Sequence, residues 1–286
     1  MNPMNPINTD KISDNIPSGR PLLEIRNLAK SFQLANGQSS VIFDGLDLTI
    51  HENEFVAVLG HSGSGKSTLL RMIAGLESVT GGNISLRGQA VNKPGKDRMM
   101  VFQNYALLPW LSVYGNIRLA VDEVMKDRSA QERDSIVREH IAMVHLEDAA
   151  DKKPGELSGG MKQRVGIARA LAVQPLLLLM DEPLGALDPF TRARLQDQIL
   201  ELYYQRHQTI VLVTHDVEEA LVMADRIIVL KAEETASIGQ VLKVPFGHPR
   251  DRKALREDPR FHSLRNQTLD LLERYFDERK QKAHVG

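Results

Sequence analysis

The chain has 286 residues, 42% of them hydrophobic, which is enough to bury a large core in one or two domains. Its 36 basic and 37 acidic residues nearly cancel, so no net field favours nucleic acid or an anionic lipid surface as the partner. The chain contains no cysteine, which excludes disulfides and thiolate metal sites and fits a reducing cytoplasm.

The first 20 residues are polar and rich in Asn, Pro and Ser, and they lack the apolar stretch of a secretory signal. We expect residues 1–20 to form a disordered tail. No apolar run in the chain reaches the roughly 18–20 residues that a membrane-spanning helix needs. These features are typical of an ordinary soluble enzyme.

The next part of the chain is predicted to be rich in strands. Residues 22–28 form the first predicted strand, and residues 41–50, which alternate apolar and polar side chains, form the second. The apolar run 55–59 predicts a strand before a glycine-rich loop and a helix at 69–74. Two glycines at 81–82 are expected to break the chain before a short strand at 83–88. A buried strand is expected at 99–102, ending at Gln103.

From residue 112 to 156 the pattern changes to helices with charged faces, which predicts a helical subdomain at about 104–165. Apolar runs at 176–180 and 209–213 predict core strands with a helix between them. A helix at 217–223 and a last core strand at 227–230 should follow.

The final predicted helix covers residues 262–282, and we expect it to pack on the core or on a second copy of the chain. Its apolar face would carry Leu264, Leu271, Leu272 and Tyr275. Strands that alternate with helices predict an α/β fold.

The loop after the strand at 55–59 fits the phosphate-binding pattern Gly-x4-Gly-Lys-Ser/Thr, in the strand–loop–helix context that this pattern requires. Glycines let the loop curl so that backbone N–H groups point at phosphates, and the helix N-terminus adds positive field. Lys66 should reach the terminal phosphates, and Ser67 should ligate Mg²⁺. A plain Gly/Ser turn is the alternative. The candidate nucleotide-binding residues are Gly60, His61, Ser62, Gly63, Ser64, Gly65, Lys66, Ser67 and Thr68.

Two acidic residues follow the apolar run at 176–180. A uniformly apolar strand indicates burial on both faces of a parallel sheet, and ligands bind at the carboxyl ends of such strands. We therefore expect Asp181 to hold Mg²⁺, through a water molecule or through Ser67. Glu182 is the candidate to orient and deprotonate an attacking water. The alternative is a solvated strand end with two surface acids.

With the sequence Leu-Ser-Gly-Gly at 157–160, the chain resembles the ATP-binding subunits of ABC transporters from about residue 22 to 230. This family signature occurs in few other nucleotide-binding proteins. The resemblance implies a P-loop NTPase fold with a RecA-like parallel-sheet core, an N-terminal antiparallel β subdomain and a helical subdomain. The ATPase domain would span residues 21–245, and residues 246–286 would form a C-terminal extension.

In the family, two cassettes form a head-to-tail sandwich, so the signature residues Ser158, Gly159 and Gly160 would face ATP held by the other chain. Ser158 is also a plausible N-cap for a helix expected at 161–173, whose positive end would favour an anion. A helix cap without a ligand is the alternative for a single chain.

Other positions match the family one by one, and the resemblance implies their roles. Phe32 corresponds to the aromatic residue that stacks on adenine, although a core position is the alternative. Gln103 corresponds to the glutamine that senses Mg²⁺ and the γ-phosphate, and Asp188 lies in the loop 186–188 that crosses the dimer interface. His215 corresponds to the switch histidine, which is counted as catalytic together with Glu182. An active ATPase is expected.

A single cassette without a membrane span implies separate membrane subunits, as in importers. The resemblance implies a peripheral protein on the cytoplasmic face of the bacterial plasma membrane. Its partners would be a second cassette (the same chain or a paralogue), two membrane permease subunits and, indirectly, a substrate-binding receptor, with no nucleic acid. The short C-terminal part is expected to lack the regulatory domain of sugar-importer cassettes, which needs on the order of a hundred residues.

The single tryptophan, Trp110, lies in Leu-Leu-Pro-Trp at 107–110, where family members line the groove for the coupling helix of the membrane subunit. Packing inside the helical subdomain is the alternative. This stretch resembles the nitrate, taurine, alkanesulfonate, cyanate and bicarbonate importer group. Pro-Arg-Asp-Arg at 249–252 resembles nitrate-type cassettes, so import of nitrate is expected, with nitrite or cyanate as related cargo and taurine, alkanesulfonate or bicarbonate as alternatives.

A remote alternative is a soluble, non-transport ABC ATPase of DNA repair or translation. Proteins of that class carry tandem cassettes, zinc modules or long coiled coils. The chain has one cassette, no cysteine and no heptad run, which favours the transport subunit.

Overall fold

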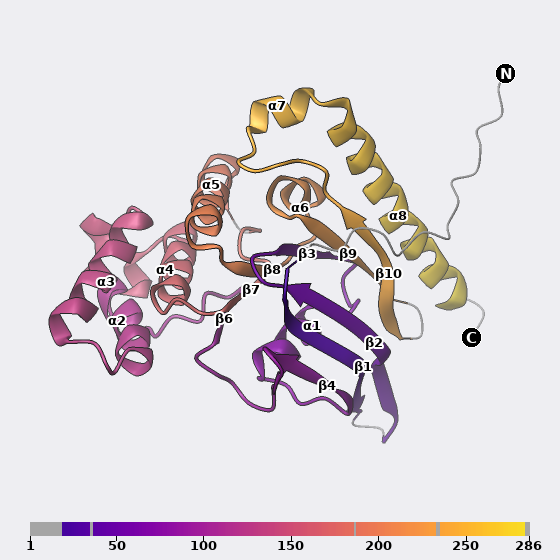
Figure 1. The fold of residues 1–286 in the computed structure, drawn as a ribbon, viewed down its shortest axis with the longest axis horizontal. Helices are drawn as coiled ribbons and strands as arrows, with labels where there is room; N and C mark the ends of the chain where they lie inside the picture. The colour runs from indigo at the N-terminus through magenta and orange to yellow at the C-terminus, as the bar shows by residue number, and fades with distance from the viewer. Residues whose placement is uncertain (1–18, 35–36, 186, 233–234, 284–286) are drawn as a thin grey trace.

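A computed structural model describes residues 19–34, 37–185, 187–232 and 235–283 of the chain (Figure 1). These residues form a 10-stranded sheet in the order β5-β4-β1-β2-β10-β9-β3-β8-β7-β6, with helices on both faces. Most of the tail predicted at 1–20 lies outside the described residues. The α/β fold expected from the sequence is confirmed.

The parallel core of the sheet consists of β9 (Arg226–Ala232), β3 (Phe55–Leu59), β8 (Thr209–Val213), β7 (Leu177–Asp181) and β6 (Arg98–Val101). Every residue of β3, β7 and β8 is buried, because helices cover both faces of these strands. The predicted bounds of β3 and β8 are confirmed. The carboxyl ends of these strands lie at one edge, where ligands bind in open α/β sheets.

An antiparallel part extends the sheet with β1 (Pro21–Gln33), β2 (Ser39–His51), β4 (Gly81–Leu86) and the short β5 (Gln89–Ala90). The expectation that the glycines at 81–82 break the chain before this strand is wrong, because both lie inside β4. A Cβ at Gly82 would lie 2.1 Å from the carbonyl oxygen of Asn27, so the close approach of β1 requires glycine there.

Strand β10 (Ala236–Lys243) joins the two parts of the sheet, since it pairs antiparallel with β9 and parallel with β2. The prediction that the strand at 227–230 is the last core strand is therefore wrong. The sequence of β10 is partly polar and has a glycine in its centre, which weakens the strand pattern. A Cβ at Gly239 would lie 2.5 Å from the ring of Tyr275, so glycine makes room for the C-terminal helix.

The predicted helical subdomain contains α2 (Val113–Val124), α3 (Ala130–Met143) and α4 (Gly159–Ala172). Two single 3₁₀ turns, Glu147–Ala149 and Pro154–Glu156, connect α3 to α4. The three helices share an apolar cluster, and α4 continues beyond residue 165 into it. Helix α4 begins two residues before the predicted start, because its first turn follows directly on the cap at Ser158.

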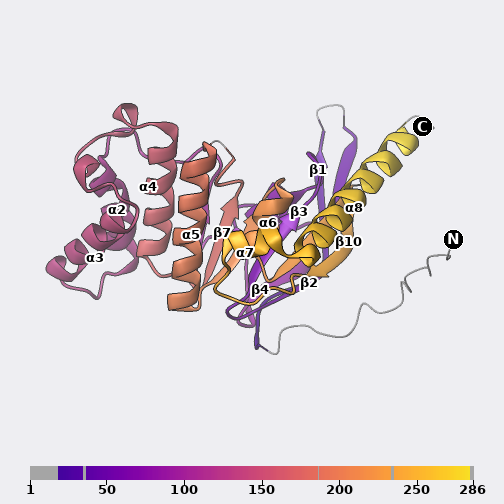
Figure 2. The same cartoon turned by 90° about the horizontal axis from the view of Figure 1, so that it is seen from above.

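The remaining helices cover the core sheet. Helix α1 (Lys66–Ala74) packs in an apolar cluster with residues of β1 and β2. Helices α5 (Pro189–Arg206) and α6 (Val217–Met223) belong to a second cluster with residues of the C-terminal helices. Figure 2 shows the C-terminal helix running along the β10 side of the sheet. Among the residues that the structure describes, no helix is long and apolar enough to cross a membrane.

The C-terminal extension forms α7 (Arg252–Glu257) and α8 (Pro259–Ala283). The predicted helix at 262–282 is confirmed, and it begins earlier than expected. Leu271 is buried and Leu264, Leu272 and Tyr275 pack against the main core, which confirms that this face lies on the core. The extension is therefore continuous with the ATPase domain in its packing.

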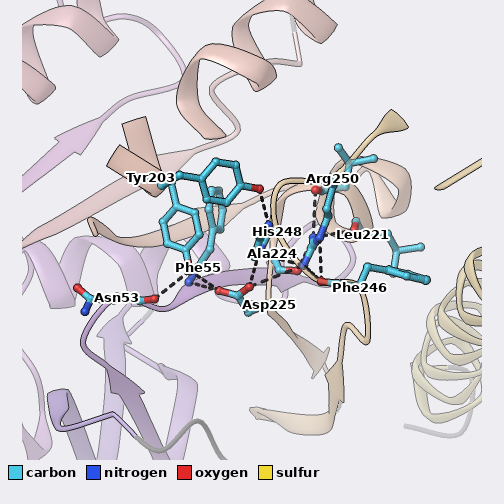
Figure 3. Close-up of polar contacts among 11 residues, drawn as sticks. Asn53, Phe55, Tyr203, Leu221, Ala224, Asp225, Phe246, His248 and Arg250 are labelled. Carbon is cyan, nitrogen blue, oxygen red and sulfur yellow. Dashed lines mark hydrogen bonds and ion pairs between the residues drawn. The ribbon is translucent and has the colours of Figure 1, made fainter. Parts of the chain in front are cut away.

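A buried polar network anchors the start of this extension (Figure 3). The guanidinium of Arg250 donates to the carbonyl oxygens of Leu221, Val222, Ala224 and Phe246 at 2.8–3.2 Å. Asp225 accepts hydrogen bonds from His248, from Tyr203 at 2.7 Å and from the backbone N–H of Phe55 at 2.9 Å. Since Phe55 begins β3, the network ties the extension to the strand that leads into the phosphate-binding loop.

Candidate functional site: a nucleotide-binding cavity at the carboxyl ends of the strands

The phosphate-binding loop connects β3 to α1 as the motif predicts. Gly65 is the N-cap of α1 with φ 84°, in the left-handed region that glycine occupies readily. A Cβ at Gly65 would lie 2.7 Å from the ring of Phe43, so space also demands glycine. The Lys66 amine donates to the carbonyl oxygens of Gly60 at 2.7 Å and His61 at 2.9 Å.

The pKa of Lys66 depends on its burial and on two nearby carboxylates. Burial lowers its pKa, while the carboxylates of Glu182 and Asp181 act in the opposite direction. A buried ammonium with two nearby acids is ready to bind a polyanion, because phosphate can replace the loop carbonyls as its partner.

Asp181 is the last residue of β7, and it faces the start of α1. The hydroxyl of Ser67 donates to its Oδ1 at 2.9 Å. Burial raises the pKa of Asp181, and the Ser67 hydrogen bond partly offsets this effect. A nearby cation would reverse the shift, since the charged carboxylate would then be favoured.

Glu182 lies where the ends of three strands converge. Its Oε2 accepts a hydrogen bond from the Gln103 amide at 3.1 Å and lies 3.5 Å from His215 Nδ1. Gln103 follows β6, and His215 follows β8. The structure therefore brings two predicted residues, Gln103 and His215, onto the carboxylate of the third.

The backbone at Glu182 is unusual, with φ 46° in the left-handed region. Its N–H donates to the carbonyl oxygen of Val213 at 2.9 Å, which holds the turn in place. Non-glycine residues in this region cost about 1–3 kcal/mol and cluster at functional sites. With this backbone the carboxylate contacts Gln103 and His215, and no sequence pattern predicts the conformation.

These side chains enclose a cavity of about 480 Å³. It is lined by Ser62, Gly63, Gly65, Lys66, Ser67, Thr68, Gln103, Glu182 and His215. The remaining candidates do not line it: Gly60, His61 and Ser64 belong to the loop, and Asp181 contacts it through Ser67. A cavity of this size with loop amides at one wall and a carboxylate at the other suits a phosphate chain.

Phe32 does not line the cavity, and its ring lies under the Lys30 amine at 4.5 Å with 36% of the residue exposed. This cation–π contact and the exposure argue against the alternative of a core position. Adenine stacking at Phe32 stays a prediction.

The signature residues lie at the N-terminus of α4, outside the cavity. Ser158 caps the helix and accepts a hydrogen bond from the Met161 N–H at 3.3 Å, as predicted from the sequence. Asp188 likewise caps α5 through the N–H groups of Phe190 at 3.1 Å and Thr191 at 3.0 Å. Within one chain these residues do not reach the P-loop cavity. Their predicted roles across a dimer stay predictions, and Ala186 lies outside the described residues.

Trp110 is 66% exposed, so the alternative that it packs inside the helical subdomain is wrong. Asn116 holds the loop around it, accepting from the Leu108 N–H at 2.8 Å and donating to the carbonyl oxygens of Leu108 and Leu111. A fixed loop with an exposed indole is suited to contact with another protein.

Two arginines that the sequence analysis missed hold the loops around the site. Arg192 of α5 donates to the carbonyl oxygens of Leu184 at 3.3 Å and Leu187 at 3.0 Å. Its guanidinium also lies 3.6 Å from Asp216, which follows His215 in the chain. Arg169 of α4 donates to the carbonyl oxygen of Ala106 at 2.8 Å. No motif marks an arginine that binds backbone carbonyls, so the sequence offered no signal for either residue.

The fold and the site together define a P-loop ATPase cassette. The family model described as ABC transporter matches residues 43–185. Among solved structures, the chain resembles the ATP-binding cassette MJ0796 in a dimeric post-hydrolysis state bound to ADP and Pi. The TM-score is 0.71 at 31% identity, covering 79% of this chain and 100% of that one.

Curated relatives point to the same family. The chain is 47% identical over 256 residues to the bicarbonate transport ATP-binding protein CmpD of Synechococcus elongatus, covering 90% of this chain and 92% of that protein. It is 51% identical over 259 residues to CmpC of Synechocystis sp., with 91% and 39% coverage. It is 45% identical over 266 residues to the nitrate import ATP-binding protein NrtC of Synechocystis sp., with 93% and 39% coverage.

The chain belongs to the ABC transporter family, as an ATP-binding cassette with ATPase activity. The predicted family, fold class and enzyme class are therefore confirmed.

Proposed function

We propose that this cassette is the energy-coupling subunit of an importer for a small oxyanion, with nitrate as the first candidate. The observation that carries the ATPase part is the convergence of Gln103 and His215 on Glu182, opposite Lys66 of the phosphate-binding loop. The transport part is supported by the names of relatives that are 45–51% identical.

Glu182 is proposed to orient and deprotonate the attacking water. Its carboxylate lies at the mouth of the loop, and the Gln103 amide and His215 imidazole fix its direction. Lys66 leaves the carbonyls of Gly60 and His61 to bind the terminal phosphates, where charge develops during transfer. His215 is proposed to contact the γ-phosphate from the opposite wall.

The residues around Ser67 fit Mg²⁺. The Ser67 hydroxyl, the Asp181 carboxylate and the Gln103 amide offer the hard oxygen donors that this ion prefers. Within the described residues no cluster of three or more His, Cys, Asp or Glu side chains suits a metal, but Mg²⁺ usually takes few protein ligands besides phosphates. When bound with ATP, the ion would neutralise charge on the phosphates.

A second cassette, the same chain or a paralogue, is proposed to complete the site. The signature residues Ser158, Gly159 and Gly160 lie at the N-terminus of α4, and this positive helix end lies outside this chain's own cavity. Facing a partner's cavity, they would bind the γ-phosphate there. ATP would thus close a dimer, and hydrolysis at Glu182 would release it.

The cassette is proposed to lie on the cytoplasmic face of the plasma membrane, bound to two membrane permease subunits. Closing and opening of the cassette dimer would be transmitted to these subunits. The exposed Trp110 loop, held by Asn116, is the proposed contact with them. A receptor would deliver the anion to the permease from the other side. Co-purification of a permease with the tagged chain would support this, whereas a strongly salt-dependent affinity for DNA or RNA would favour a non-transport ATPase.

Bicarbonate is a second candidate cargo, favoured by the relatives named for bicarbonate transport at 47–51% identity. ATP hydrolysis by the complete transporter in vesicles would be measured with its receptor and sodium nitrate, sodium bicarbonate or taurine. Stimulation by nitrate is expected. Stimulation by bicarbonate alone would show that bicarbonate is the cargo in place of nitrate, and the proposal of an anion importer would still stand. If none of the anions stimulated hydrolysis, the proposal of an anion importer would be contradicted.

A further inference from the structure

The C-terminal helix contacts the phosphate-binding loop at His61. Its Nε2 lies 2.7 Å from the carbonyl oxygen of Leu272, and its ring lies 4.7 Å from the ring of Phe276, tilted by 35°. Leu272 and Phe276 are four residues apart, so both lie on the same face of α8. A helix carbonyl has two lone pairs, so that of Leu272 can accept from the imidazole besides its own helix.

Helix α8 is held firmly enough to act as a fixed support. Its first turns are anchored by Phe261 and Leu271 in the main core and by the Arg250 network that precedes them. The Tyr275 ring fills the space that a side chain at Gly239 would occupy on β10. Since Tyr275 lies between the two residues that contact His61, this segment of α8 is fixed on the sheet.

His61 also carries the backbone carbonyl that organises the loop. Its oxygen accepts from the Lys66 amine at 2.9 Å and from the Ser64 N–H at 3.1 Å. A shift of His61 would therefore move both the resting position of Lys66 and the loop amides that face the cavity. The side chain of this residue is fixed from outside the loop, by α8.

We propose that α8 is a positioning element of the ATP site, which holds His61 so that the phosphate-binding loop is ordered before ATP arrives. His61 and Phe276 are then positioning residues for ATP binding. Preorganisation of a binding loop raises affinity because less freedom is lost on binding. The proposal rests on the ATPase activity of the cassette and does not depend on which anion is transported.

The test compares ATP affinity and turnover in His61→Ala, Phe276→Ala and the double variant of the full chain, with the Kd measured by equilibrium dialysis. Each single variant should raise the Kd for ATP about three- to tenfold, the range for losing one neutral hydrogen bond or aromatic pair. The kcat should change less than about twofold, because Glu182, Gln103 and His215 remain in place. The Kd of the double variant should exceed that of His61→Ala by no more than about twofold, since His61→Ala already removes the ring contact that Phe276→Ala breaks.

Conservative variants separate positioning from loss of fold. His61→Gln keeps an N–H donor for the Leu272 carbonyl and His61→Phe keeps the ring, so each should restore part of the affinity. Arg274→Ala, at an exposed position of the same helix, should bind ATP as the wild type does. An unchanged Kd in both single variants, or additive effects in the double variant, would overturn the proposal. If the wild-type chain itself did not bind ATP, the ATPase assignment would be refuted instead.

Discussion

Arg250 offers a severe test of how the extension is attached, because its guanidinium is buried with only 1% of the side chain exposed. Arg250→Ala would leave four carbonyl oxygens without this donor and would remove the cation 3.7 Å from Asp225. Removing one partner of a buried charged network costs about 3–5 kcal/mol. Such a loss is a large share of the roughly 5–15 kcal/mol by which domains are stable.

The free energy of unfolding would be measured by urea denaturation. Arg252→Ala is a matched control two residues away, because its ion pair with Asp197 is partly exposed, with 25% and 60% of the side chains accessible. This control should cost about 0–1 kcal/mol. Arg250→Lys keeps the charge but not the planar fork of donors, so its loss of unfolding free energy should lie between those of Arg250→Ala and Arg252→Ala. A loss below about 1 kcal/mol in Arg250→Ala would refute the anchoring role.

Three further predictions concern the loop, the acid in the network and the helix contact. Lys66→Ala should raise the Kd for ATP about 10–100-fold in equilibrium dialysis, because charge-assisted hydrogen bonds to phosphate are lost. A smaller change in Kd would indicate that the backbone N–H groups of the loop bind the phosphates without help from Lys66.

Burial alone would raise the pKa of Asp225, but hydrogen bonds from His248, Phe55 and Tyr203 hold it below its usual 3.8. Its stabilising effect is therefore present above pH 3.8 and lost as the pH falls through the lower folded pKa. The stability gap between wild type and Asp225→Asn should shrink over that acid range in urea titrations, and a constant gap would contradict this. Gly239→Ala should lower the free energy of unfolding by about 1–3 kcal/mol, because the added methyl group overpacks against Tyr275. An unchanged stability would contradict the packing of α8 against β10 at this position.

Much of the core could be predicted because its signals are local. The strands at 55–59 and 209–213 and the helix at 217–223 match β3, β8 and α6 in both bounds. Both strands are short, almost wholly apolar runs, and this pattern can be read from the sequence alone. Strand β10 was missed because its partners and its central glycine have meaning only in the assembled sheet.

The site was predictable as a set of residues but not as a geometry. Gln103, Glu182 and His215 converge at the ends of neighbouring strands, yet the left-handed backbone of Glu182 has no counterpart in any sequence pattern. The contacts of Arg192, Arg169 and Arg250 with carbonyl oxygens leave no pattern in the sequence. Arg250 lies in the stretch that resembles nitrate-type cassettes, and the structure shows its guanidinium bonded to backbone carbonyl oxygens at the start of the extension.

Glu182→Gln tests the central claim most directly, because it removes the proposed base and keeps a hydrogen-bonding side chain of the same size. ATP binding and single-turnover hydrolysis would be measured in the transporter complex. We predict a Kd for ATP within about twofold of the wild type and a rate lower by about 10²–10⁴-fold, the contribution of a general base. Hydrolysis at the wild-type rate would contradict the account.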